Sequence, residues 1–276
     1  MQWVLIAVVG AGVGYLGGMF GKGGSAIATP FLALIGVPPI VAVAAPLPAT
    51  IPGTLVAFSR YHREGLTDAR VIRWSVACGV PATVIGAVVT RWIGGAQLVK
   101  ITDAVVAALG IRILLQRPAR QAPAAPQEPE GASGMEPTGG TLDSATTTMT
   151  QVRRPAASYS TARLVSVALV VGFLAGLLAN SGGFLLVPLY LSVLRLPIKQ
   201  SLACSLAVAA MLAVPGTIVH AALGHIDWTV AAVFGAASIP LSSLGARTAL
   251  RMNAAHLERI YGAGLTILGL GLLAFT

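Results

Sequence analysis

The sequence consists mainly of long apolar stretches separated by short polar turns, with one long polar interval in the middle of the chain. A helix needs about 20 apolar residues to cross the roughly 30 Å hydrocarbon layer of a membrane. The runs are continuous and do not alternate with period two, which argues against a barrel of strands. The pattern therefore predicts an all-α, polytopic membrane protein. We expect long helices at about 2–20, 40–59, 70–90, 97–115, 164–179, 199–222, 228–250 and 257–275.

Composition leads to the same class. Charged residues make up 10% of the chain and hydrophobic residues 55%, whereas about 25% of the residues of a soluble domain are charged. So few charges cannot cover the surface of a water-soluble protein of this size. Cys78 and Cys204 lie inside apolar runs, which excludes a disulfide scaffold and a cysteine-based zinc site. The chain becomes apolar directly after Met1 and Gln2, without a basic leader segment, so we expect the first helix to be retained.

The polar interval covers residues 116–162 and is rich in Pro, Ala, Gly, Ser and Thr. It has too few large apolar groups to offset the entropy lost on ordering, so it is predicted to be a disordered linker. It divides the chain into a first transmembrane repeat (1–115) and a second transmembrane repeat (163–276).

The two halves are related by a constant shift of 159 positions. Matches of proline and aspartate are the informative ones, because glycine and alanine match often by chance in this composition. Three such pairs fall in one register: Pro38/Pro197, Asp68/Asp227 and Pro81/Pro240. The chain is therefore interpreted as an internal duplication.

Each half also contains a short apolar piece between its first two long helices, at Ser25–Ile35 and Phe184–Leu194. Eleven residues give a helix of about 17 Å, too short to cross alone. If each piece counts as a crossing, sixteen of the eighteen Lys and Arg residues fall on one face, leaving Arg91 and Lys100 on the other. If each piece turns back instead of crossing, ten Lys and Arg residues fall on one face of the membrane and eight on the other. Cytoplasmic loops collect basic residues, so the count favours two inverted repeats of about five segments, four long helices and one short broken or re-entrant helix in each. Both termini are then periplasmic and the linker cytoplasmic.

The chain has glycine-rich breaks directly before both short pieces. Glycine lets the backbone turn without a Cβ clash, and an uncapped helix N-terminus offers free N–H groups and a partial positive charge that suit an anion. Paired breaks of this kind mark the substrate site of inverted-repeat transporters. The alternatives are that the glycines only allow close helix packing and that Lys22 only extends to the membrane interface. The candidate substrate-binding residues are Lys22, Gly23, Gly24 and Ser25 in the first half, and Asn180, Ser181, Gly182 and Gly183 in the second.

These motifs resemble the TauE/SafE family of sulfite and organosulfonate transporters. The resemblance rests on Gly18–Ser25, on Leu34–Pro38, on Asn180–Pro188 and on Ser201–Leu206 ahead of His220. It implies transport of sulfite, sulfoacetate or a related sulfonate across the inner membrane of a bacterium. It also suggests a polar contact at Ser205, although the first half has Ala45-Pro46-Leu47-Pro48 at the equivalent place.

Few other polar residues are candidates. His220 is included as a candidate substrate contact or proton carrier, with an interfacial histidine as the alternative. Asp68 and Asp227 are expected to cap the helices that follow them. The chain contains no Gly-x-Ser-x-Gly or His-Glu-x-x-His motif, so we expect no enzyme activity, catalytic residue, metal or cofactor.

The scarcity of acids in the predicted helices favours export of an anion by alternating access, driven by the membrane potential. The alternative function is a proton-coupled uptake permease for a sulfonate or another small anion. The expected partners are the small anionic substrate and the lipid bilayer, and not a nucleic acid.

Overall fold

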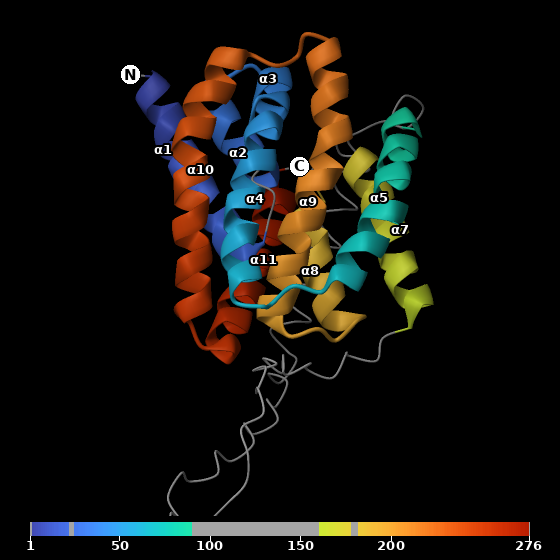
Figure 1. Ribbon diagram of the computed structural model, residues 1–276. Coiled ribbons are helices and arrows are strands. Elements are labelled where there is room, and N and C mark those ends of the chain that lie inside the picture. Colours follow the sequence, from blue (N-terminus) through green and yellow to red (C-terminus); the bar gives the residue numbers. More distant parts are fainter. Residues whose placement is uncertain (1, 22–24, 90–159, 178–181, 276) are drawn as a thin grey trace, which may run out of the picture.

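The computed structural model describes residues 2–21, 25–89, 160–177 and 182–275, and every element in these ranges is an α-helix (Figure 1). The all-α prediction is thus confirmed for this part of the chain. The predicted helix at 97–115 lies outside the described residues, as does the linker up to residue 159. The helices of the first half are α1 (Gln2–Phe20), α2 (Ser25–Leu34), α3 (Pro39–Ala44), α4 (Pro46–Arg63) and α5 (Ala69–Val89). Those of the second are α7 (Thr161–Leu177), α8 (Gly183–Ser192), α9 (Ile198–Ala222), α10 (Trp228–Arg251) and α11 (Ala254–Phe275).

Four helical stretches in the described ranges are long and apolar enough to cross a membrane: Gln2–Phe20, Ile40–Arg63, Ile198–Ala222 and Trp228–Arg251. The two short pieces form α2 and α8, each of 10 residues. At 1.5 Å per residue each extends about 15 Å, roughly half of the hydrocarbon layer.

The expected helix at 40–59 differs from the structure in two respects. It is divided into α3 and α4 at Ala45, and α4 continues to Arg63. Pro46 has no N–H to donate to the carbonyl oxygen of Ala42, so the helical ladder is interrupted at that point. The hydroxyl of Thr29 on α2 donates to this same carbonyl oxygen at 3.5 Å. The interruption thereby ties the short helix α2 to the α3–α4 segment.

The two halves share their local geometry at the shift of 159 residues. The carboxylate of Asp68 accepts from the N–H groups of residues 70 and 71 at 2.9 and 3.2 Å. The carboxylate of Asp227 accepts from the N–H groups of residues 229 and 230 at 2.9 and 3.1 Å. Both predicted caps are therefore confirmed. The turns before them are also alike, with Gly65 at φ 64° and Gly224 at φ 68°.

Corresponding helices point in opposite directions. In Figure 1, α1 and α4 run from the upper end of the bundle to the lower end, while α7 and α9 run from the lower end to the upper. Inverted repeats require this relation. The complete pair of five-segment repeats remains a prediction, because the first-half counterpart of α11 lies outside the described residues.

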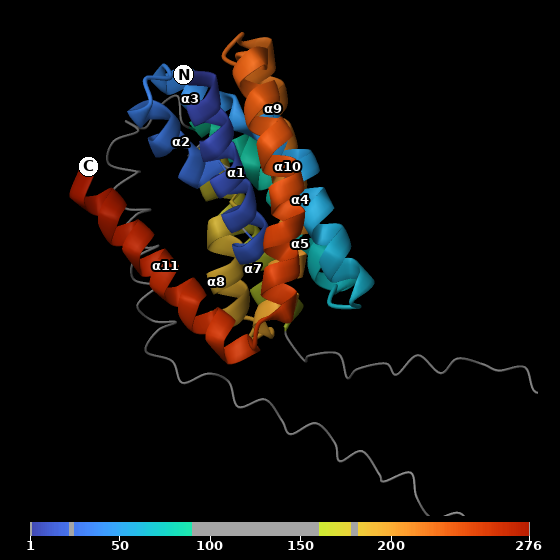
Figure 2. The same cartoon turned by 90° about the vertical axis from the view of Figure 1, so that its left-hand side faces the viewer.

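The first long helix of each half packs on the other half. Helix α1 packs along α10, and α7 packs along α5 (Figures 1 and 2). A Cβ added to any of Gly10, Gly14 or Gly18 would collide with the backbone of α10, at residues 234, 238 and 242 respectively. The four-residue spacing places all three glycines on one face of α1, the arrangement that lets two membrane helices approach closely. These α1 glycines therefore allow α1 and α10 to pack closely.

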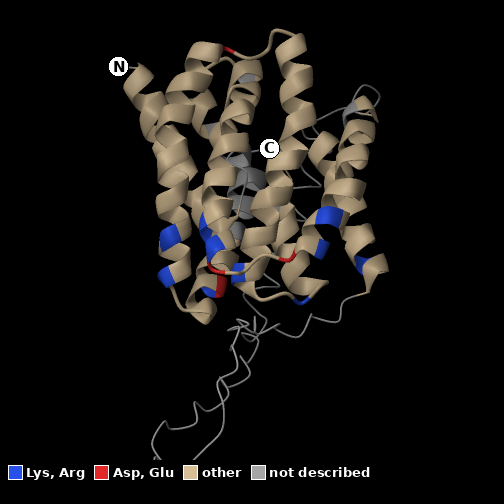
Figure 3. Ribbon diagram, viewed as in Figure 1, with Lys and Arg blue, Asp and Glu red and all other residues tan. Residues whose placement is uncertain are grey.

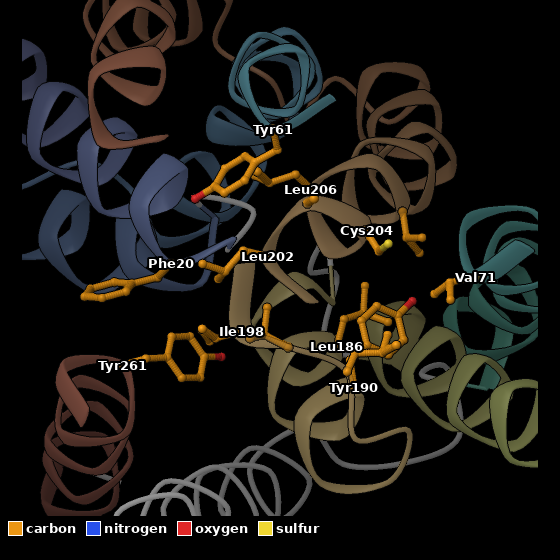
Figure 4. Packing of buried hydrophobic residues seen from close by; sticks show 14 of the residues in the cluster. Phe20, Tyr61, Val71, Leu186, Tyr190, Ile198, Leu202, Cys204, Leu206 and Tyr261 are labelled. Carbon is orange, nitrogen blue, oxygen red and sulfur yellow. The ribbon is translucent and has the colours of Figure 1, made fainter. Parts of the chain in front are cut away.

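Helix α9 lies at the centre of the bundle. Its residues 201–210 are all buried, as expected for a helix whose whole circumference is apolar or small. Figure 4 shows Leu202 and Leu206 between Tyr61 and Phe20 on one side and the second-half core around Tyr190 on the other. The two halves therefore share one core, and α9 joins its parts.

The described Lys and Arg residues gather at one end of the bundle, the lower end in Figure 3. We call this the basic end; α4 and α10 finish there, and α5, α7, α9 and α11 begin there (Figure 1). Within the described ranges, this clustering agrees with the five-segment count. The N-terminus lies at the opposite end (Figure 1).

Candidate functional site in the helix bundle

A small hollow lies between α1, α4, α9 and α10. Its volume is about 20 Å³, which is room for about one water molecule. From Gly53 on α4, ten residues of helix lead to Arg63 at the basic end, or about 15 Å. The hollow is therefore near mid-depth in a 30 Å layer. Its lining consists of Val13, Gly14, Gly17, Gly18, Ala49, Thr50, Gly53, Thr54, Leu206, Phe234, Ser238 and Ser242.

The glycines open the hollow on two sides. Gly14, Gly17 and Gly18 leave the wall of α1 without side chains, and Gly53 does the same on α4. The nearest atom to a Cβ added at Gly53 would be the hydroxyl oxygen of Ser242, at 3.9 Å. One carbon thus fits at Gly53, whereas a larger side chain there would enter the hollow.

Four hydroxyl groups supply the polar part of the lining. Thr50 donates to the carbonyl oxygen of Pro46 at 2.9 Å, and Thr54 to that of Thr50 at 2.7 Å. Ser242 lies 2.8 Å from the carbonyl oxygen of Gly53, a bond that joins α10 to α4, and Ser238 bonds within its own helix at 3.4 Å. Each of these hydroxyls is thus within hydrogen-bond distance of a backbone carbonyl oxygen. Because a hydroxyl can rotate about its C–O bond, each can instead donate to a bound ligand.

These four hydroxyl residues are not among the predicted site residues, although the sequence carries a signal for them. Thr50 and Thr54, and likewise Ser238 and Ser242, are separated by four residues within otherwise apolar stretches. That spacing places both members of a pair on one face of a helix. Two such faces in helices of different halves indicate a shared polar surface.

The first break lies next to this hollow and is held by Ser205. The chain leaves α1 at Gly21, which has φ 66°. The hydroxyl of Ser205 is 3.0 Å from the carbonyl oxygen of Gly21 and 2.9 Å from that of Leu202. A Cβ on Gly21 would lie 2.5 Å from the Ser205 hydroxyl oxygen. Ser205, selected from the sequence, therefore positions the start of the break.

The second break has apolar surroundings where it is described. Gly182 precedes α8 with φ 66° and gives the helix no side-chain cap, and α8 begins at Gly183. A Cβ on Gly182 would lie 3.0 to 3.4 Å from side-chain atoms of Ala175, Val171 and Leu212. This described part of the second break contacts α9 at Leu212, about 10 Å along the helix from Ser205.

The other predicted break residues fall outside the described part of the chain. These are Lys22, Gly23, Gly24, Asn180 and Ser181; Ser25 begins α2, but its side chain also lies outside it. Their contribution to the site therefore remains a prediction.

His220 lies apart from the hollow. It belongs to the last turn of α9, about 22 Å along the helix from Ser205. Its Nδ1 atom is 3.3 Å from Nδ1 of His225, and the two rings are 5.3 Å apart. The structure thus does not bring Ser205 and His220 into one site. Among the residues that the structure describes, no group of three or more His, Cys, Asp or Glu side chains is placed to hold a metal ion.

Comparison with known proteins identifies the family. The family model described as "Sulfite exporter TauE/SafE" matches residues 6–272, nearly the whole chain. The chain belongs to the TauE/SafE family. A "Probable membrane transporter protein" of Xylella fastidiosa (strain 9a5c) is 25% identical over 264 residues, which cover 94% of this chain and 90% of the relative.

A second relative is the "Probable membrane transporter protein YunE" of Bacillus subtilis (strain 168). It is 29% identical over 96 residues, which cover 35% of this chain and 34% of the relative, so the chain spans about a third of that protein in the match. No solved structure matches the chain. As a member of this family, the chain is a membrane transporter.

Proposed function

We propose that the protein transports small sulfur oxyanions, such as sulfite, sulfoacetate or a related organosulfonate, out of the cytoplasm. Family membership over residues 6–272 supports the substrate class. The observation that carries the mechanism is the hydroxyl-lined hollow at mid-depth, next to the break at Gly21. Transporters with inverted repeats bind their substrates at this depth, beside discontinuous helices.

The donors for an oxyanion come from two sources in this proposal. The four hydroxyls of the hollow rotate toward the ligand. The N-terminal N–H groups of α2 and α8, together with Lys22, supply the positive potential, since the first N–H groups of a helix have no partner within it. Because the hollow holds about one water, the site must widen to admit the anion. Rocking of the two halves about the breaks provides that change.

The membrane potential is the proposed driving force. No acid lines the hollow, and the described acids, Glu64, Asp68, Asp227 and Glu258, lie at or near helix ends. An anion that leaves an inside-negative cell gains about 2.3 kcal/mol per charge per 100 mV. Export then needs no coupled proton. We place the protein in the inner membrane with the basic end in the cytoplasm, because cytoplasmic loops collect Lys and Arg.

Reconstituted vesicles test this function. We expect flux of sulfite, sulfoacetate or taurine that follows an imposed potential, with sulfate as a comparison anion. Lys22→Ala and bulky replacement of Gly24 or Gly183 should each lower binding of the transported anion. Flux that ignores the potential but follows a pH gradient would instead support the alternative, proton-coupled uptake. Unchanged binding in all three variants would refute the site at the breaks.

A further inference from the structure

Arg60 occupies an unusual position on α4. It is half-buried near the basic end, on the same face as Gly53 and the buried Ala57. Seven residues, or about 10 Å of helix, separate it from Gly53. It therefore lies in the contact between α4 and α10, two turns from the hollow on its basic side.

The guanidinium group of Arg60 is anchored at one nitrogen. Its Nε–H donates to the hydroxyl oxygen of Ser243 on α10 at 2.9 Å, and Ser243 is itself buried. An arginine has five N–H donors in a planar fork, so this bond leaves both terminal NH₂ groups for another acceptor. Paired N–H donors of this kind bind two oxygens of an oxyanion at once.

Among the residues that the structure describes, no acid is paired with Arg60. Glu64 lies one turn further along, but neither Arg60 nor Arg247 forms an ion pair with an acid in the ranges the structure describes. Arg247 follows Ser243 by four residues and thus lies on the same face of α10. The Arg60 guanidinium, partly withdrawn from water beside a buried hydroxyl, favours binding of an anion because an uncompensated charge is costly to desolvate, while Arg247 is exposed.

We propose that Arg60, held by Ser243 and accompanied by Arg247, is an entry site that binds the oxyanion on its way from the basic end to the hollow. The ligand class is a small anion with at least two acceptor oxygens on one centre. A lipid phosphate has the same chemistry, but we assign the site to the soluble anion. Arg60 lies on the same face of α4 as Gly53, about two turns from the hydroxyls of the hollow. This inference rests on the proposed function.

The test measures initial rates of sulfite flux against sulfite concentration in vesicles. For Arg60→Gln we expect the KM to rise about tenfold with less than a twofold change in maximal rate, because the residue binds the anion before the rocking step. Arg60→Lys keeps the charge but not the fork, so its KM should rise about threefold. Ser243→Ala and Arg247→Gln should each raise the KM about threefold. Arg73→Gln is the matched control, because it removes one exposed charge from the same end on α5; its KM should stay within twofold.

Other results would contradict the entry site, the identity of the anion bound there or the proposed function. If Arg60→Gln has a KM within twofold of the wild type, the entry site is wrong although sulfite transport stands. If the KM rises only in vesicles that contain phosphatidylglycerol, and not in pure phosphatidylcholine, the group bound at Arg60 is a lipid headgroup. If the wild type moves no sulfur oxyanion at all, the proposed function fails first. Should Arg60→Gln fail to fold, as judged by gel filtration and thermal unfolding, the KM of Arg60→Lys replaces it as the test. A rise of about threefold supports the entry site, and an unchanged KM contradicts it.

Discussion

Helices α4 and α9 occupy equivalent places in the two halves, but α4 contributes Ala49, Thr50, Gly53 and Thr54 to the lining of the hollow, whereas α9 contributes Leu206. At the shift of 159 residues, Thr50, Gly53 and Thr54 of α4 correspond to Ala209, Leu212 and Ala213 of α9. Leu212 is 1% exposed. Its side chain lies 3.2 Å from where a Cβ on Gly79 would be and 3.4 Å from the same point on Gly182. One leucine thus fills in the second half the space that a glycine leaves open in the first.

The helices that face them differ in the same way. Ser238 and Ser242 of α10 correspond to Gly79 and Thr83 of α5. The Ser242 hydroxyl lies 2.8 Å from the carbonyl oxygen of Gly53 on α4 and 2.7 Å from that of Ile239 in its own helix, whereas the Thr83 hydroxyl bonds only within its own helix, to the carbonyl oxygen of Gly79 at 2.8 Å, among the bonds of the described residues. The first-half helix α4 and its partner therefore form the polar site, and the second-half helix α9 and its partner form the core.

The largest loss of stability is expected when a cavity is made in the core at Leu212 of α9. Leu212→Gly should lower the free energy of unfolding by about 4 kcal/mol, because it leaves a cavity in the core and adds a glycine to a helix. Denaturant unfolding in detergent measures this loss. Leu212→Met, which nearly conserves volume, should cost less than about 1.5 kcal/mol. Equal losses in the two variants would show that the side chain does not fill a tightly packed space.

A large side chain that enters the hollow from α4 should abolish transport without unfolding the protein. Gly53→Leu places in α4 the residue that α9 has, and we expect sulfite flux to fall about 100-fold, equivalent to about 2.7 kcal/mol. Gly12→Leu is the matched control, because nothing lies within 4 Å of a Cβ at that exposed position of α1. Flux in Gly53→Leu within twofold of the wild type would exclude the hollow as the substrate site.

The two hydroxyls at equivalent positions should differ in importance. Ser242→Ala removes a donor from the hollow and the bond to α4, so flux should fall about tenfold, as expected for about 1.4 kcal/mol of lost interaction. Thr83→Ser, which keeps the hydroxyl, and Thr83→Ala should each change flux less than twofold. A similar fall at both positions would mean that the two sides share the substrate.

The caps should behave alike, because they are the part of the repeats that has not diverged. Asp68→Ala and Asp227→Ala each remove the acceptor for two N–H groups, so each should lower the unfolding free energy by about 1 kcal/mol. Thermal unfolding of the two variants side by side measures this. A difference of more than about 1 kcal/mol between them would contradict equivalent roles.

The features that were predictable from the sequence are those set by neighbours along the chain. The positions of α1, α9 and α10 follow from apolar length, since a helix in lipid satisfies its own backbone groups. The caps at Asp68 and Asp227 follow from bonds to residues two and three positions away. The length of the apolar run predicts one helix at 40–59, whereas the structure divides it at Ala45. Pro46 and Pro48 are the local signal for this division.

The candidate site was only partly predictable. Ser205 was selected through the family resemblance, but its partner, the carbonyl oxygen of Gly21, is 184 residues away. Thr50, Thr54, Ser238 and Ser242 were not selected, because a hydroxyl within an apolar helix usually bonds back to its own helix. Their four-residue spacing places each pair on one face of its helix, but the spacing does not show that the two faces meet.

The sequence by itself determined that this chain is helical, crosses a membrane and carries two related halves with a break in each, because helix length, caps and glycine turns are local properties. The tertiary structure decided which of the two halves keeps an open polar space and which of the few basic residues lies beside it. Those outcomes depend on which helix faces meet, and α4 meets α10 only across nearly two hundred residues of chain. Packing between distant segments, and not local preference, therefore selects the site.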